Sequence, residues 1–142
     1  MSRKFASVFF KNTQGTFGLD GTAKTVTFTN LYNNTNDIAN LTTGIVTIDE
    51  DGLYYVCAQL STESSDTLPT EYTDLYLFKN STQICQMKRG DGHLTTRTNF
   101  RKYLRVGTLV RASSGDTFSI KALSDVTVNI EDAYFNVLRV FD

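Results

Sequence analysis

His93 is the only histidine of the sequence and the first candidate for acid–base chemistry. It lies in the glycine-rich segment 89–93, between Gly92 and Leu94. A Ser-His-Asp hydrolase needs its histidine held firmly between a nucleophile and a carboxylate. The tip of a turn is poorly preorganised for a general base. We therefore expect no catalytic residue and no enzyme activity.

Three consecutive acids, Asp49, Glu50 and Asp51, precede Gly52 and could ligate calcium, which prefers carboxylate and carbonyl oxygens. The same pattern is also typical of a solvated turn, and the sequence leaves calcium binding open. No Cys/His spacing of a zinc site and no glycine loop for phosphates occurs. We predict no metal site and no cofactor.

Charge is unevenly distributed, although the net charge is only −1. Residues 79–111 carry eight basic side chains and one acidic one, whereas residues 1–78 carry four basic and nine acidic ones. This asymmetry could match one subunit to the next or attract an acidic partner, or the charges could simply solvate outward strand faces. Phe100 and Tyr103 lie within the basic stretch, but the pI of about 5.8 argues against nucleic-acid binding.

Short β-branched and aromatic runs recur between Gly, Asn, Asp and Ser, and helical periodicity is nearly absent. This pattern predicts an all-β sandwich or barrel. The 142 residues are a usual length for one domain, so we expect a single domain over 1–142. The expected strands lie near 5–11, 24–29, 44–48, 53–61, 73–79, 83–88, 98–112, 117–123 and 133–141.

Two polar stretches, 30–43 and 63–71, are predicted to be the longest loops. Loops carry binding residues more often than the strands they connect. Together with the basic stretch they supply the residues that we expect to contact a partner: Asn33, Asn34, Asn36, Asp66, Arg89, Arg97 and Arg101.

Two strands are apolar on both faces, although a sheet that faces water on one side should alternate. In 53–60 the even positions are all apolar and so are the odd positions 53, 55 and 57. In 134–141 the apolar positions 134, 138 and 140 likewise alternate with 135, 137 and 141. Cover must come from a loop such as 30–43 or from a second subunit, and we favour a subunit. The expected interface residues are Tyr54, Tyr55, Cys57, Tyr134, Phe135, Leu138 and Phe141. Cys57 and Cys85 are expected to be free thiols.

An ordered set of landmarks resembles the superfamily of tumour necrosis factor and the globular heads of complement. The landmarks are TGIVTI and DGLYYV at 43–48 and 51–56, LYLFKN at 75–80, LVRASSGDTFSI at 109–120, and AYFNVL at 133–138. The resemblance implies a two-sheet jelly roll that assembles as a tight homotrimer through aromatic faces around a three-fold axis. It also implies a binding protein.

The lack of a secretory h-region and of a membrane-spanning apolar run predicts synthesis in a host cytoplasm and no membrane partner. The resembling fold also serves phage virions. We expect a cement protein that decorates the phage capsid surface at three-fold sites, with the major capsid protein as its partner, because little chain remains for a fibre stalk. The alternatives are a receptor- or glycan-binding knob of a fibre or spike and a secreted complement-head-like ligand. A small-molecule ligand is not expected.

Overall fold

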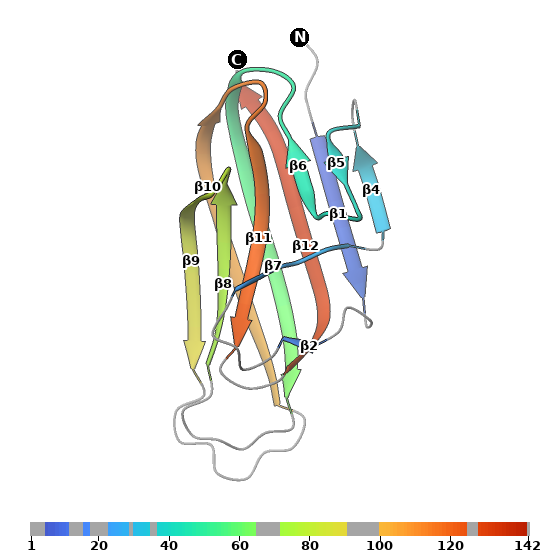
Figure 1. Cartoon of the computed structure of the whole chain (residues 1–142), viewed down its shortest axis with the longest axis vertical. Coiled ribbons are helices and arrows are strands. Elements are labelled where there is room, and N and C mark those ends of the chain that lie inside the picture. The colour runs from blue at the N-terminus through green and yellow to red at the C-terminus, as the bar shows by residue number, and fades with distance from the viewer. Residues whose placement is uncertain are drawn as a thin grey trace.

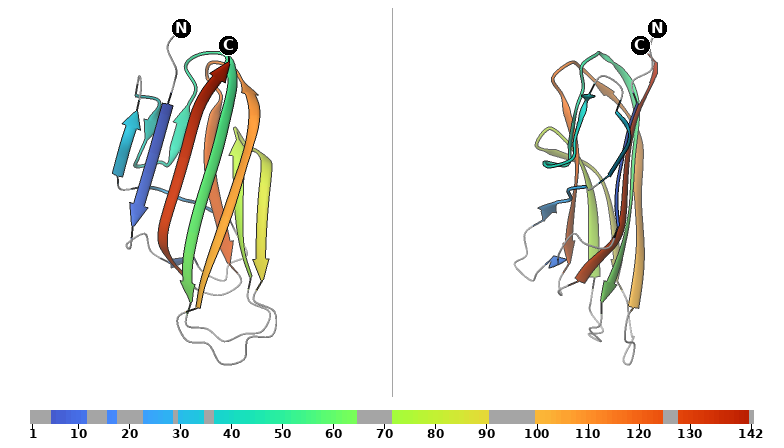
Figure 2. Two further views of the ribbon diagram at one scale, coloured as in Figure 1. Left: turned by 180° about the vertical axis from the view of Figure 1, so that it is seen from behind. Right: turned by 90° about the vertical axis from the view of Figure 1, so that its right-hand side faces the viewer.

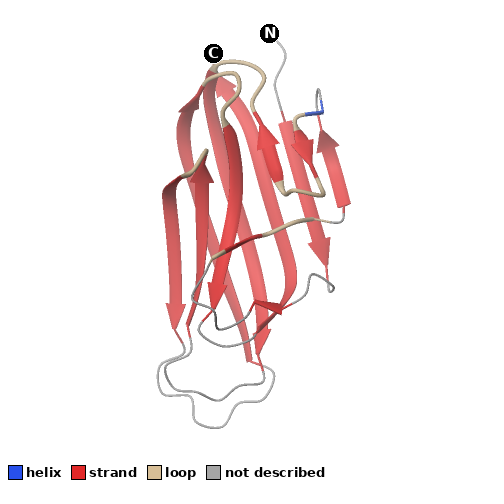
Figure 3. Cartoon of the chain, viewed as in Figure 1, coloured by secondary structure: helices blue, strands red, loops and turns tan. Residues whose placement is uncertain are grey.

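The computed structural model describes residues 5–11, 16–17, 23–28, 30–34, 37–64, 72–90, 100–124 and 128–141. Their strands form two antiparallel sheets that lie one on the other (Figures 1 and 3). The side view in Figure 2 separates the two layers. The predicted all-β, two-sheet architecture is confirmed.

Sheet A contains the longest strands of the described chain. Its members are β1 (Phe5–Lys11), β2 (Thr16–Phe17), β4 (Asn30–Asn34), β7 (Gly52–Ser64), β10 (Phe100–Ala112) and β12 (Val128–Phe141). The order across the sheet is β10-β7-β12-β1-β4, and the short β2 also pairs with β12. The last strand therefore lies between β7 and the first strand, β1.

Sheet B covers one side of sheet A. Its members are β3 (Lys24–Thr25), β5 (Ala39–Asn40), β6 (Ile45–Thr47), β8 (Tyr72–Lys79), β9 (Thr82–Gly90) and β11 (Thr117–Ser124). The order is β5-β6-β11-β8-β9, with β3 paired to β11. At the open side of the sandwich β9 lies next to the edge strand β10.

The segment predicted to be a long loop, 30–43, contains two strands, so that prediction is wrong. β4 pairs with β1 and β5 pairs with β6, each at the edge of its sheet. Backbone pairing at an edge does not require alternating apolar residues, so the asparagine-rich sequence gave no strand signal. The strand predicted at 24–29 is shorter, because only Lys24–Thr25 pairs in the sheet ladder.

The core fills the space between the sheets through strict alternation along the strands. In β11 every second residue is buried, and Phe118, Ile120 and Ala122 have no exposed surface. Across the sandwich Phe28 stacks on Phe135 with ring centroids 6.1 Å apart. Each fully buried large side chain stabilises the fold by about 1.5–3 kcal/mol relative to exposure. Apolar packing between the sheets is thus the main source of stability.

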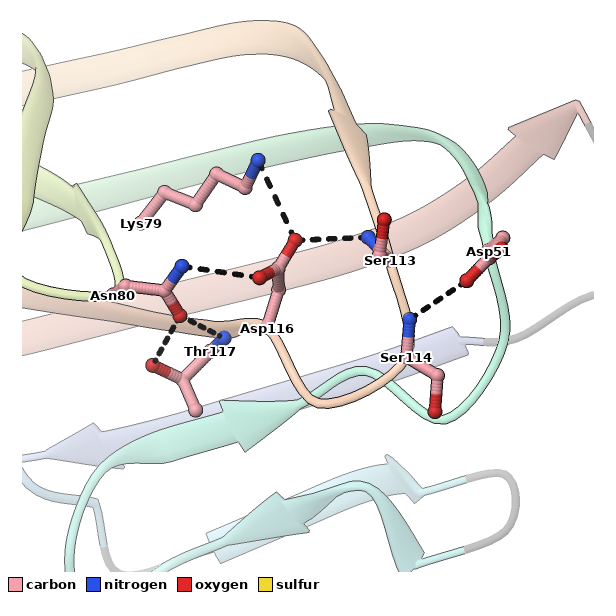
Figure 4. Close-up of polar contacts among 7 residues, drawn as sticks. All are labelled: Asp51, Lys79, Asn80, Ser113, Ser114, Asp116 and Thr117. Atoms are coloured by element: carbon pink, nitrogen blue, oxygen red, sulfur yellow. Dashed lines mark hydrogen bonds and ion pairs between the residues drawn. The ribbon is translucent and has the colours of Figure 1, made fainter.

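Two turns are joined by a polar cluster around Asp116 (Figure 4). Asn80, with φ 55°, forms the β8–β9 turn, and its amide Nδ2 donates to Asp116 at 3.0 Å. The other Asp116 oxygen accepts from the backbone N–H of Ser113 at 2.8 Å and lies 3.4 Å from the Lys79 ammonium. These hydrogen bonds hold the pKa of Asp116 below its usual range. The cluster fixes the β8–β9 turn against the loop before β11.

Sulfur atoms of β9 contact the outer edge of β10. The Arg105 backbone N–H donates to the Met87 sulfur at 3.1 Å, and the Cys85 thiol lies 4.0 Å from the Gly107 carbonyl oxygen. Unpaired edge groups invite pairing with another chain, and covering them is a common protection. Side chains of sheet B therefore shield part of the free edge of sheet A.

Candidate protein-binding face

The outer face of sheet A, on the side away from sheet B, is built by β10, β7 and β12 in register. We call the outward residues of these three strands the A face. Residues paired directly across strands lie side by side on one face of a sheet. Their rows, from β10 through β7 to β12, are Arg111–Leu53–Phe141, Leu109–Tyr55–Leu138, Gly107–Cys57–Asn136 and Arg105–Gln59–Tyr134.

The large exposed apolar side chains of the described residues all lie on this face. They are Tyr55 at 44% exposure, Tyr103 at 52%, Leu109 at 58%, Tyr134 at 40% and Phe141 at 67%. Single exposed apolar residues are normal, but a continuous apolar patch marks an interaction site. The A face therefore has the composition of a protein-binding surface.

The outer face of sheet B is different. Its aromatic rings are partly buried and covered by cations: Lys88 lies 4.0 Å from the centre of the Tyr72 ring, and Lys121 lies 4.4 Å from that of Phe78. The Tyr76 hydroxyl donates to the buried Asp74 carboxylate at 3.0 Å. Burial, followed by this hydrogen bond, raises the pKa of Tyr76 to about 12. On this face the rings of Tyr72 and Phe78 and the hydroxyl of Tyr76 all contact polar or charged groups of the same chain.

A hollow of about 770 Å³ lies near the middle of the A face. Its lining includes Tyr55, Cys57 and Gly107, with Arg105 and Tyr134 on its sides. The Arg105 guanidinium donates to the Gln59 side-chain oxygen at 3.1 Å. A Cβ at Gly107 would lie 3.2 Å from the Cys57 Cβ and 3.4 Å from the Tyr55 hydroxyl. The absence of a side chain at Gly107 thus keeps the hollow open.

The acidic turn at 49–51 is held by an arginine at the end of β12. The Arg139 side chain is 7% exposed, and its Nε and Nη2 donate to the Asp51 carbonyl at 3.1 and 2.7 Å. Its Nη1 lies 3.4 Å from the Glu50 carboxylate. The approach needs Gly52, because a Cβ there would lie 2.6 Å from the Arg139 Nε.

The carboxylates of this turn are used for contacts within the chain. Asp51 accepts from the Ser114 backbone N–H at 2.8 Å, and Glu50 pairs with Arg139. The Tyr54 hydroxyl donates to the Glu50 carbonyl at 2.7 Å, and burial raises the pKa of that phenol. In the described ranges no group of three or more His, Cys, Asp and Glu side chains is arranged to hold a metal ion.

The predicted interface residues divide into two sets. Tyr54 and Phe135 are 0% and 1% exposed inside the core, so their assignment to a subunit interface is corrected. The sequence could not tell which face of a doubly apolar strand points to sheet B. The other five, Tyr55, Cys57, Tyr134, Leu138 and Phe141, lie together on the A face. Their contact with another subunit stays a prediction.

The predicted partner-binding loop residues do not form one loop. Asn33 and Asn34 lie in β4 and Arg89 lies in β9, so the prediction that they belong to loops is corrected. Arg101 lies in β10, within the strand expected at 98–112, and its assignment to a binding loop is corrected as well. Backbone pairing places Arg89 opposite Thr73 and Arg101 opposite Glu63. Asn36, Asp66 and Arg97 fall outside the described residues, as does His93.

Sequence analysis missed the contribution of β10 to the A face. Tyr103 and Leu109 alternate there with arginines and with Gly107, and all five odd positions from 103 to 111 are exposed. The alternation of Leu104 and Val106 with these positions was a visible signal. Cys57 and Cys85 are both free thiols.

Neither a known family model nor a curated protein matches the sequence. Among the described residues no helix has the length and apolar character needed to cross a membrane. Solved structures do match. The globular domain of complement 1qA from zebrafish superposes with a TM-score of 0.73 at 19% identity, covering 97% of this chain and 98% of that one.

The Eiger tumour necrosis factor from S. frugiperda superposes with a TM-score of 0.74 at 13% identity, covering 100% of this chain and 95% of that one. Identities this low support a likeness of fold alone. The chain has the two-sheet, tumour-necrosis-factor-like jelly-roll fold that its sequence resembles.

Proposed function

We propose that the chain is a non-enzymatic binding protein that works as a homotrimer, with the A face as the contact between subunits. The observation that carries this proposal is the gathering of Tyr55, Tyr103, Leu109, Tyr134 and Phe141 on three adjacent strands. When three copies place their A faces around one axis, each face meets its two neighbours and is removed from water.

The size of the face suits a contact between subunits. β7 and β10 have 13 residues each, so the three strands make a strip about 43 Å long and about 14 Å wide. Its flat area is roughly 600 Å² for each subunit, which a trimer divides between two neighbours, against the ~800 Å² that each partner buries in a standard two-body interface. The likeness to a tumour necrosis factor and to a complement globular domain favours closure around a three-fold axis.

The first test is the mass of the native protein and of two aromatic-to-aspartate variants. The wild type is expected at three times the chain mass of 15.9 kDa in light scattering. Tyr55→Asp should give a folded monomer or an aggregate, because it places an unpaired carboxylate in the buried contact. The matched control Phe78→Asp changes a ring on sheet B and should remain trimeric. A monomeric wild type at micromolar concentration would end the proposal.

Within this function we propose a role as decoration, or cement, on a phage capsid, with the major capsid protein as partner and the virion surface as location. A homotrimer supplies a three-fold axis that matches the three-fold positions of an icosahedral shell. Purified particles should contain the protein in stoichiometric amount, and particles made without its gene should rupture at lower force or temperature. Particles that lack the protein, or that are equally strong without it, would overturn this role.

The superposition on a complement globular domain favours a second candidate equally, a recognition head on a fibre, spike or secreted ligand. In that case the trimer would lie at the tip of an appendage or outside the cell, and its receptor or glycan would be found on a target cell. Immunogold labelling of native particles separates the two roles, because capsid-wide and tip-only labelling exclude each other.

A further inference from the structure

We propose that the hollow over Gly107 is a socket that receives the Tyr134 ring of the neighbouring copy and thereby sets how the subunits are aligned. The inference rests on the proposed homotrimer and names the pair of side chains that makes its contact specific. Three observations support it: the hollow itself, the lack of a side chain at Gly107, and the exposed Tyr134 ring on the same face.

The socket exists because one outward position on the three strands, Gly107, has no side chain. Gly107 lies between two residues with side chains, Arg105 and Leu109, on the outward side of β10, and Cys57 is its partner on β7. Cys57 and Tyr55 lie within 3.4 Å of where a Gly107 Cβ would be. Glycine weakens a strand by loss of packing and by entropy, and one of its roles in a strand is to leave room for a close approach by another group.

The lining of the hollow suits a phenol ring. Tyr55, Cys57 and the Gly107 backbone give it apolar and flat surfaces. Polar groups of Gln59 and Asn136 lie in the same lining and can meet a hydroxyl. The Arg105 guanidinium adds a cation that favours the face of an aromatic ring. Tyrosine combines an apolar body with a polar tip, which is the combination that this lining requires.

Symmetry selects Tyr134 as the occupant. The A face is about three times longer along its strands than across them, so subunits bury most of it when the three-fold axis runs along the strands. Rotation about that axis keeps each residue at its own height. The Gly107 row therefore meets the same row of the next copy or a row one step away, about 7 Å along a strand.

At that height the described A face presents two aromatic rings, Tyr55 and Tyr134, one row on either side of Gly107. Both rings line the hollow of their own chain, but Tyr55 lies on the central strand β7, directly beside the strand of Gly107. Cyclic contacts join opposite flanks of a surface. Gly107 on β10 and Tyr134 on β12 are on opposite sides of β7. Tyr134, 40% exposed, is thus the ring that fits.

A double-mutant cycle tests the pair in the full chain. Gly107→Leu fills the socket and Tyr134→Ala removes the ring, and each should raise the concentration at which trimers dissociate by about tenfold or more in sedimentation equilibrium. Their effects should not add, because both abolish one contact. Tyr103→Ala, on the same face but in another row, is the matched control and should add to Gly107→Leu. Circular dichroism of the dissociated chains checks that each variant folds.

Alkylation of Cys57 gives a second readout that does not depend on affinity. Iodoacetamide labelling followed by peptide mass spectrometry should show Cys57 reacting more slowly in the wild-type trimer than in the dissociated wild-type chain. A Tyr134→Ala trimer held above its dissociation concentration should show no such slowing relative to the dissociated Tyr134→Ala chain. Cys85 on β9 lies outside the hollow lining and serves as the internal reference.

The outcomes separate the socket from the trimer. A wild type that is monomeric would remove the proposed function and the socket together. A wild-type trimer in which Gly107→Leu and Tyr134→Ala add fully, or in which Cys57 reacts as fast as in the dissociated wild-type chain, would overturn the socket alone. A small molecule found in the hollow of a native trimer would do the same.

Discussion

At the scale of single residues, Arg139 shows how a charged side chain can belong to the core of a β-sandwich. Its guanidinium is buried because the Asp51 carbonyl and the Glu50 carboxylate satisfy it, and because Gly52 leaves room for it. The acidic turn that looked like a calcium site is thereby tied to the end of β12. In the folded chain this acidic turn contacts a cationic side chain, Arg139, through the Asp51 carbonyl and the Glu50 carboxylate.

Arg139→Met should lower the free energy of unfolding by about 2 kcal/mol, since it removes two charge-assisted hydrogen bonds to a carbonyl. Glu50→Gln is the control and should cost less than about 1 kcal/mol, because the Glu50 side chain is 45% exposed and its ion pair is screened. Urea denaturation at one protein concentration measures both. Equal losses would show that the ion pair, not the carbonyl contact, matters.

Tyr76 should make the protein sensitive to alkali. Its pKa is raised to about 12 from an ordinary 10, so the neutral phenol is favoured in the folded state. The stability it contributes is complete below pH 10 and is lost as pH rises through about 12. Tyr76→Phe should flatten the decline of the urea midpoint between pH 10 and 12, and cost about 1 kcal/mol at neutral pH. An unchanged alkaline slope would contradict this.

At the scale of elements, two turns depend on glycine for different reasons. Gly44 and Gly115 both have positive φ, 71° and 95°. A Cβ at Gly44 would lie 2.1 Å from the Val26 carbonyl oxygen, whereas a Cβ at Gly115 would meet nothing within 4 Å. The first glycine is required by packing and by conformation, the second by conformation alone.

Gly115→Ala should therefore cost about 1 kcal/mol, the ordinary penalty of a left-handed residue with a side chain. Gly44→Ala should cost clearly more, because the backbone near Val26 must also move. Thermal or urea unfolding of the two variants gives the comparison directly. A Gly44→Ala variant as stable as Gly115→Ala would show that this part of the fold relaxes easily.

The element scale also shows how far the sequence could be interpreted. Short apolar and β-branched runs correctly predicted strands at 73–79 and 117–123, where β8 and β11 lie. In 53–60 and 134–141 both faces are apolar, so Tyr54 and Tyr55 could not be told apart without the register of neighbouring strands. The strand β4 was not predicted, because its backbone hydrogen bonds go to β1, whose paired residues lie more than 20 positions earlier in the chain.

The hollow on the A face could not have been predicted either. It requires Gly107, Cys57 and Tyr134 to meet from three strands, and the last two are separated by about half of the chain. Local pattern carries no information about such distant neighbours. The landmarks that resemble a known family predicted the fold. The outward residues could be identified only from the pairing of the strands in sheet A.

At the scale of the whole molecule, a trimer makes stability depend on protein concentration. The thermal midpoint of the wild type should rise by about 3 °C for each tenfold increase in concentration, because dilution favours separate unfolded chains. The Tyr55→Asp monomer should show no such dependence. Calorimetry at three concentrations measures both, and a wild-type midpoint that stays constant would argue against assembly.

The position of β12 between β7 and β1 has a consequence for synthesis. Phe5 of β1 pairs with Leu138 of β12. One edge of β1 therefore has no pairing partner until β12 has been synthesised. A ribosome must release residue 141 before the sheet can close, and until then apolar strand edges stay open to other nascent chains. Yield should thus respond to chaperone supply and growth temperature more than to codon choice.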